Sequence, residues 1–284
     1  MKTIKMDKKT FYIVQQAAEI IQSADCLLII AGAGMGVDSG LPDFRGDKGF
    51  WRIHPNFEQE GLSFQDLANP QWFFDYPNRA WGFYGHRYQL YNKTKPHEGF
   101  DILNRWCKQK QQGSFINTTN VDGHFQKSGF SKQIVYESHG SINYLQCSLN
   151  CEHKIWHLKA LDFIVDGDSL LASGEVPTCP SCGVIARPNI LMFGDAGWLP
   201  DRASQQRGNY LEWKQNSVGH KVAVIEIGVG ISGCSARSKS WAMENRKLIR
   251  INPRDFIGDD NTLSIAMGAK DALKAIDDVL GRNG

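Results

Sequence analysis

The chain has 284 residues, of which 42% are hydrophobic and 22% are charged, and these shares are ordinary for a globular protein with a buried core. They exclude a disordered chain, and no run approaches the roughly 18 apolar residues that a membrane span needs. The 32 basic and 30 acidic residues give a net charge of +2. A net charge this small does not favour general electrostatic binding to nucleic acid or to anionic membranes. We therefore expect a soluble protein of about two domains, with no nucleic-acid and no membrane partner.

The first forty residues follow an order of helix, strand and glycine-rich turn. Apolar residues at helical spacing predict a helix over 9–24, and the apolar run 26–31 predicts a fully buried strand. Gly32-Ala33-Gly34 ends that strand, and small residues there let backbone amides approach a pyrophosphate. This order is typical of a nucleotide-binding α/β unit. Three later runs resemble further buried parallel strands, at residues 114–118, 222–228 and 247–252.

Two segments interrupt this α/β core. Residues 62–91 are rich in aromatic side chains at helix-compatible spacing and predict a small helical insert. Residues 141–186 contain two close cysteine pairs and several turn-forming residues, as expected of a metal-stapled ribbon. The tail 259–280 is expected to close the fold with a helix.

The cysteine pairs are C-x3-C at Cys147 and Cys151, and C-x2-C at Cys179 and Cys182. Two such pairs on separate turns can complete a tetrahedral shell of four thiolates around one zinc ion. Four protein ligands leave no open coordination position, so this zinc would be structural. The alternative, four unrelated buried cysteines, does not predict two close pairs. Because no apolar signal region follows the basic N-terminus, we expect a reducing, cytoplasmic location.

Residues 31–46 read AGAGMGVDSGLPDFRG, and the GLPDFRG portion is far more specific than the glycines alone. This segment closely resembles the NAD-binding signature of the sirtuins, the NAD-dependent protein deacylase family. Further segments resemble the family's motifs in the same order and cover most of the chain: TTNVD at 118–122, ESHG at 137–140, RPNILMFGD at 187–195 and IN at 251–252. The cysteine pairs follow the ESHG segment, as they do in sirtuins.

The resemblance implies a protein-lysine deacylase that consumes NAD, uses an acyl-lysine protein or peptide as substrate, and releases nicotinamide and O-acyl-ADP-ribose. It implies that His139 is the general base on a ribose hydroxyl, a task suited to a group that titrates near neutrality. Asn120 and Asp122 would orient the ribose and the carboxamide. The other cofactor contacts that it implies are Gly32, Ala33, Gly34, Asp43, Phe44, Arg45, Trp51, Thr119, Gly228, Gly230 and Asn252. Phe193 and Gly194 are implied substrate contacts.

The fold that this resemblance implies is an α/β one, with a Rossmann-like parallel sheet and an inserted smaller domain. We expect that smaller domain to combine a zinc ribbon with a helical module. The expected boundaries are 1–49, 96–140 and 187–284 for the NAD-binding domain, 50–95 for the helical module and 141–186 for the zinc-binding module.

Several positions depart from the family's pattern. Thr119 replaces the usual Gln, residues 124–125 read His-Phe in place of Leu-His, and Asp195 replaces Glu. Residues 228–230 read Gly-Val-Gly in place of Gly-Thr-Ser, which removes two hydroxyl donors, although backbone amides can still serve a phosphate. Residues 231–237 are unlike the usual peptide-binding segment. These departures leave two alternatives open: a mono-ADP-ribosyltransferase or NAD glycohydrolase of the same fold, and a non-catalytic sensor of NAD or ADP-ribose.

Tyr84 and Arg87 match the Y-x-x-R spacing of sirtuins that remove acidic acyl groups such as succinyl. A spacing of three places both side chains on one helical face, where a phenol and a guanidinium can bind a carboxylate. The alternative is an aromatic core with a solvated arginine. Plainer roles also exist for Asn120 and Asp122, which could cap a helix, and for Asp43, which could be a turn residue.

Overall fold

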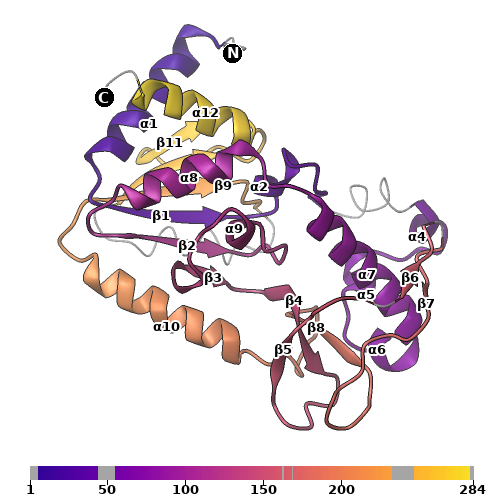
Figure 1. Ribbon diagram of the computed structural model, residues 1–284. Helices are drawn as coiled ribbons and strands as arrows, with labels where there is room; N and C mark the ends of the chain where they lie inside the picture. The colour runs from indigo at the N-terminus through magenta and orange to yellow at the C-terminus, as the bar shows by residue number, and fades with distance from the viewer. Residues whose placement is uncertain (1–5, 44–54, 162, 168, 232–245, 282–284) are drawn as a thin grey trace.

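A six-stranded, all-parallel sheet forms the centre of the larger part of the molecule (Figure 1), in the order β11-β10-β9-β1-β2-β3. The computed structural model describes residues 6–43, 55–161, 163–167, 169–231 and 246–281. The strands are β1 (Cys26–Ala31), β2 (Ser114–Thr118), β3 (Val135–Glu137), β9 (Val222–Ile227), β10 (Arg246–Ile251) and β11 (Thr262–Ile265). β1, β2 and β9 are buried along their whole length, as is typical of parallel strands covered on both faces, and in β2 the burial includes the polar residues Ser114, Asn117 and Thr118.

The strand order is that of the Rossmann fold. The chain runs outward from β1 through β2 to β3, returns to the middle of the sheet at β9, and runs outward again through β10 to β11. β1 and β9 are neighbours in parallel register, with Ala31 opposite Ile227, so their carboxyl ends lie side by side. In open α/β sheets, ligands bind outside the carboxyl ends of the strands at this point of reversal. The predicted fold class is therefore confirmed.

Helices cover both faces of the sheet (Figure 1). α1 (Lys8–Ser23), α8 (Glu98–Lys108) and α12 (Ala269–Leu280) pack together on one face, and α10 (Asp201–Asn216) packs on the other, against β2 and β3. Shorter helical segments are α2 (Gly34–Val37), α9 (His124–Lys127) and the 3-10 turn η1 (Lys132–Ile134). None of the helices in the described ranges is both long enough and apolar enough to cross a membrane.

The remaining elements form a second group with its own core. Its helices are α4 (Pro55–Gln59), α5 (Phe64–Leu67), α6 (Trp72–Asp75) and α7 (Pro77–Lys93). Its strands are β4 (Gly140–Cys147), β5 (Ile155–His157) and β8 (Ala186–Ile190) in an antiparallel sheet, and β6 (Ile164–Val165) with β7 (Ala172–Ser173) in a hairpin. Trp81 and Phe83 of α7 share one apolar cluster with Ile142 and Leu145 of β4, which ties the helical insert to the ribbon.

The tail differs from its sequence-based expectation. The helix expected over 259–280 is confined to α12, because the segment before it forms the edge strand β11, in parallel register with β10. β11 is only half buried, and of its four residues only Ile265 is fully buried in the main core. Its short sequence alternates only weakly between apolar and polar residues, so it gives little indication of a strand. The predicted domain boundaries stay a prediction. β8 crosses the predicted boundary at residue 187, and the core of the second group also includes Leu41 and Val121 of the predicted NAD-binding segments.

Candidate active site

A cleft of about 750 Å³ opens at the carboxyl ends of β1 and β9 and extends to the helical module. It is lined by most of the residues that the sequence analysis singled out, although they are widely separated in the chain. These lining residues are Gly32, Ala33, Asp43, Tyr84, Arg87, Thr119, Asn120, Asp122, His139, Phe193, Gly228 and Gly230.

Six of the residues predicted to contact cofactor or substrate are not among the described residues that line this cleft. Phe44, Arg45 and Trp51 lie outside the described ranges. Gly34 and the exposed Gly194 are each next to a lining residue. Asn252 is buried and donates from Nδ2 to the backbone oxygen of Val229 at 3.0 Å, so it holds the 228–230 loop at the edge of the cleft. The proposed ribose contact of Asn252 stays a prediction.

The glycines after β1 and β9 let two backbones touch. The Gly34 N–H donates to the oxygen of Gly228 at 3.0 Å, and Gly228 has a φ of 61°. A Cβ on Gly228 would lie 2.4 Å from the Cα of Gly34, and one on Gly32 would lie 2.8 Å from the oxygen of Gly228. Any side chain at these positions would push the two loops apart at the point where a dinucleotide is expected.

We expect Gly228→Ala to destabilise the protein and to weaken NAD binding. A left-handed backbone at a non-glycine residue costs about 1–3 kcal/mol, and the clash with Gly34 adds about 1–3 kcal/mol of overpacking. Gly219→Ala is the matched control, because Gly219 has a φ of 85° but no atom within 4 Å of an added Cβ. Urea unfolding and NAD titration measure both effects. Equal losses of stability in the two variants would contradict the close-approach argument.

The end of β2 is tied to the end of β1 by a short chain of hydrogen bonds. The Thr118 hydroxyl donates to Ala31 O at 3.1 Å and accepts from the Asn120 N–H at 3.0 Å. Asn120 Nδ2 donates to Gly32 O at 3.0 Å. The backbone turn after β2 therefore holds Asn120 directly beside the glycine loop.

Asp122 lines the cleft, and a local hydrogen bond fixes its side chain. Its Oδ1 accepts from the backbone N–H of His124, the first residue of α9, at 2.8 Å, while Gly123 is the N-cap of that helix. A carboxylate has two oxygens, so this bond leaves Oδ2 for other contacts. The role of Asp122 toward the ribose or the carboxamide stays a prediction.

His139 lies on the turn between β3 and β4, where its neighbours are fixed on both sides. The Ser138 N–H and hydroxyl both donate to Thr118 O, at 2.9 and 3.1 Å. Gly140 has a φ of 79°, and a Cβ there would lie 2.0 Å from Asn189 O, so β4 and β8 are in backbone contact. The His139 oxygen accepts from the Leu191 N–H at 3.0 Å. The turn thus presents the His139 side chain to the cleft from a rigid support.

His124, which stands where sirtuins usually have Leu, is a core residue. Its side chain is fully buried and packs edge-on against Phe100, with ring centroids 5.7 Å apart. Burial lowers the pKa of His124, so the imidazole stays neutral at physiological pH. The exchange of Leu-His for His-Phe therefore alters the packing behind the site and adds no second imidazole to the lining of the cleft.

The helical module contributes a polar group set among aromatic rings. Arg87 donates from Nε and Nη2 to the Tyr91 hydroxyl, at 3.1 and 2.9 Å, and its guanidinium lies 5.4–5.6 Å from four ring centroids, those of Phe64, Phe83, Tyr84 and Tyr91. Tyr84 is fully buried, and burial raises its pKa to about 12. Among the described residues, its hydroxyl has no hydrogen-bond partner. The protonated phenol and the guanidinium therefore line the same part of the cleft.

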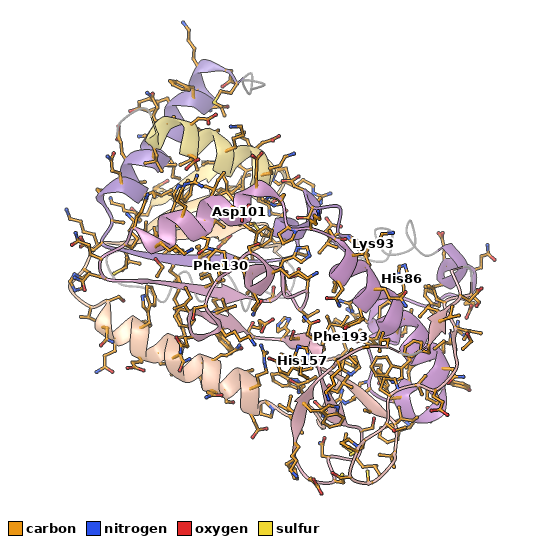
Figure 2. The ribbon with its side chains drawn as sticks, viewed as in Figure 1. His86, Lys93, Asp101, Phe130, His157 and Phe193 are labelled. Carbon is orange, nitrogen blue, oxygen red and sulfur yellow. The ribbon has the colours of Figure 1, made fainter. Side chains whose placement is uncertain are left out.

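Two residues that support the cleft were not predicted from the sequence. Tyr91 follows Arg87 by four residues on the same helix, and that spacing could have indicated the contact. Asp195 was noted only as a departure from the family, yet its carboxylate accepts from both terminal nitrogens of Arg187, at 2.7 and 2.8 Å. Both side chains are almost fully buried, and the pair fixes the loop that presents Phe193 (Figure 2) to the cleft.

The four cysteines of the ribbon lie together outside the cleft. Their Sγ atoms are all within 4.8 Å of one another, and two of the pairs, Cys147 with Cys182 and Cys151 with Cys179, are 3.6 Å apart. A tetrahedral site with metal–sulfur distances of about 2.3 Å has sulfurs about 3.8 Å apart. The four residues therefore fit a metal ion bound only by thiolates.

The sheet has the strand order of the Rossmann fold, and the glycine loops after β1 and β9 touch beside the cleft. These features define a dinucleotide-binding α/β protein of the Rossmann type. The model of the Sir2 family matches residues 32–212, and the chain belongs to this family. It is 31% identical to an NAD-dependent protein deacylase of Aquifex aeolicus, over 81% of this chain and 84% of that protein. An NAD-dependent protein deacylase of Pyrococcus furiosus is 30% identical over 66% of this chain and 67% of that protein.

Solved structures agree on the fold. A structure described as concerning the mechanism and regulation of Sir2 enzymes matches with a TM-score of 0.68 and 23% identity, covering 96% of this chain and 99% of that one. A Sir2 homologue in complex with NAD matches with a TM-score of 0.67 and 21% identity, covering 99% and 96%.

Proposed function

We propose that this protein is an NAD-dependent protein-lysine deacylase that releases nicotinamide and O-acyl-ADP-ribose. The observation that carries the proposal is the convergence of the glycine loops, Asn120, Asp122 and His139 on one cleft of a Sir2-family chain. The activity named for the Aquifex and Pyrococcus relatives supports the same reaction.

NAD supplies an electrophilic ribose carbon when its nicotinamide departs. The residues of the cleft fit such a co-substrate, since the backbone of the two glycine loops can approach a pyrophosphate at the point of strand reversal. Asn120 and Asp122, fixed by the turn after β2, orient the ribose and the carboxamide. The reaction requires that water be kept away from the reacting centre.

His139 acts as general base and takes a proton from a ribose hydroxyl. Its imidazole suits this task because an ordinary histidine titrates near neutral pH. The acyl-lysine side chain approaches along Phe193, on the loop after β8, so its acyl group reaches the cleft from the ribbon side.

Nicotinamide release, measured with and without an acyl-lysine peptide, tests the proposal. Release that depends on the peptide, with an equal amount of deacylated peptide, is the expected result. The altered residues 228–230 and 231–237 favour a second candidate, ADP-ribosyl transfer or NAD hydrolysis, for which release without peptide is the expected result. Binding of NAD without any release would instead support a sensor.

The wall formed by Tyr84 and Arg87 supports a preference for acidic acyl groups. We expect Arg87→Ala to lower the ratio of desuccinylation to deacetylation about ten- to a hundredfold, as a charge-assisted hydrogen bond of about 1.5–3 kcal/mol is lost. Arg79→Ala is the control, because Arg79 lies on the same helix but pairs with Glu60 outside the lining of the cleft. An unchanged ratio in Arg87→Ala would exclude this role.

Zinc is the metal that we assign to the four cysteines, because a closed shell of four thiolates is typical of structural zinc sites. It would staple the ribbon and take no part in catalysis. We also place the protein in the cytoplasm, and its buried free thiols, Cys26 and Cys107, are compatible with a reducing compartment.

A further inference from the structure

A buried amide network joins the metal-binding turn of β4 to the loop over residues 191–199. Gln146 immediately precedes the ligand Cys147 and is fully buried. Its Oε1 accepts from Asn189 Nδ2 at 2.9 Å and from the Leu199 N–H at 3.1 Å. Its Nε2 donates to Asn150 Oδ1 at 3.0 Å and to Gly197 O at 2.8 Å. One side chain thus makes four hydrogen bonds and connects three segments.

Asn150 strengthens the same connection from the next turn. It precedes the ligand Cys151 and has a φ of 52°, a conformation that Asn tolerates better than most residues. Its Nδ2 donates to Gly197 O at 2.8 Å, so Gly197 O accepts from both amides. Both side-chain amides that donate to Gly197 O are therefore next to a cysteine of the metal-binding cluster.

The 191–199 loop reaches the reaction site at its other end. The Leu191 N–H donates to His139 O at 3.0 Å, and the Phe193 N–H donates to Ala68 O of the helical module at 2.9 Å. Asp195, held by Arg187, also accepts from the Met192 N–H at 3.2 Å. The segment that presents Phe193 to the cleft is thus hydrogen-bonded to His139 at one end and to the amide network beside the metal site at the other.

Polar groups in such a buried place are costly unless each of them is satisfied, and a satisfied network specifies one arrangement of the elements it joins. We propose that Gln146 and Asn150 are positioning residues, which set the 191–199 loop for acyl-peptide binding by fixing it to the metal-binding turn. The functional part of this inference rests on the proposed deacylase function. It predicts that cutting the network changes peptide binding while the metal and the NAD site are retained.

Asn150→Gly is the variant that tests this inference. Glycine adopts the left-handed backbone without strain, so the substitution removes the amide and leaves the turn intact. His153→Gly is the matched control, because His153 lies in the same turn with a φ of 48° and an exposed side chain. We expect the peptide KM of Asn150→Gly to rise about two- to thirtyfold, a range typical of residues that couple distant sites, with the NAD affinity unchanged.

Two further measurements separate positioning from simple loss of the ribbon. Hydrogen exchange of the 191–199 amides should quicken in Asn150→Gly and not in His153→Gly, and the zinc content of both variants should equal that of the parent protein. Unchanged exchange, an unchanged peptide KM, or a loss of zinc in Asn150→Gly alone would overturn the positioning role. If the parent protein releases no nicotinamide with any acyl peptide, the proposed function fails, while the exchange experiment still decides whether the network holds the loop.

Discussion

His139→Ala is expected to lower the rate of peptide deacylation about 10²–10⁴-fold, the range typical for loss of a general base. The imidazole is supplied to the cleft by a turn that is fixed on both sides, by Thr118 through Ser138 and by Leu191 through the His139 backbone. Removing the ring therefore leaves the turn in place and takes away only the group that accepts the proton. Deacylated peptide, quantified at saturating NAD, measures the loss.

The control is His157→Ala, since His157 (Figure 2) lies exposed on β5 and does not line the cleft. Both variants should keep the thermal midpoint of the parent protein. A His139→Ala protein that deacylates as fast as His157→Ala would exclude His139 as the base. A fall in thermal midpoint confined to His139→Ala would assign the loss to folding.

Four strands of the central sheet, β1, β2, β9 and β10, could be predicted from the sequence because each contains an apolar run that ends at a glycine or a polar residue. β3 has only three residues and was not predicted. β1 and β2 begin and end at the predicted residues, and α1 departs from its predicted range by one residue at each end. α10 was not predicted because its sequence has no clear apolar stripe. The helix buries only Ala203, Gln206 and Tyr210. α8 was also not predicted, although its apolar residues recur at helical spacing.

The candidate site was predictable where it consists of short motifs and not where it depends on contacts between them. Motif residues as distant as Gly32 and Gly228 line one cleft, because parallel strands bring their carboxyl ends to the same edge of the sheet. The contacts of Arg187 with Asp195 and of Gln146 with Gly197 involve side chains and backbone whose proximity is set by tertiary packing. No periodicity in the sequence encodes such distances.

Removal of the metal is expected to unfold the ribbon and to abolish deacylation. Structural zinc sites of four thiolates contribute binding free energies of about 10–16 kcal/mol, which is folding free energy for the segment they close. The six-stranded sheet has cores of its own on both faces. Treatment with a strong chelator should therefore release one zinc per chain and raise hydrogen exchange in β4, β5 and β8, while NAD binding is weakened less than peptide binding.

Cys182→Ser tests the same site by substitution, and Ser181→Ala is its control, because both residues are exposed in one turn and only Cys182 belongs to the sulfur cluster. The cysteine variant should lose zinc, and the serine variant should retain it. Since Gln146 and Asn150 stand next to two of the other ligands, the loosened turn should also release the 191–199 loop. Full peptide affinity in a zinc-free protein would show that the ribbon folds without metal, and it would separate the metal site from substrate binding.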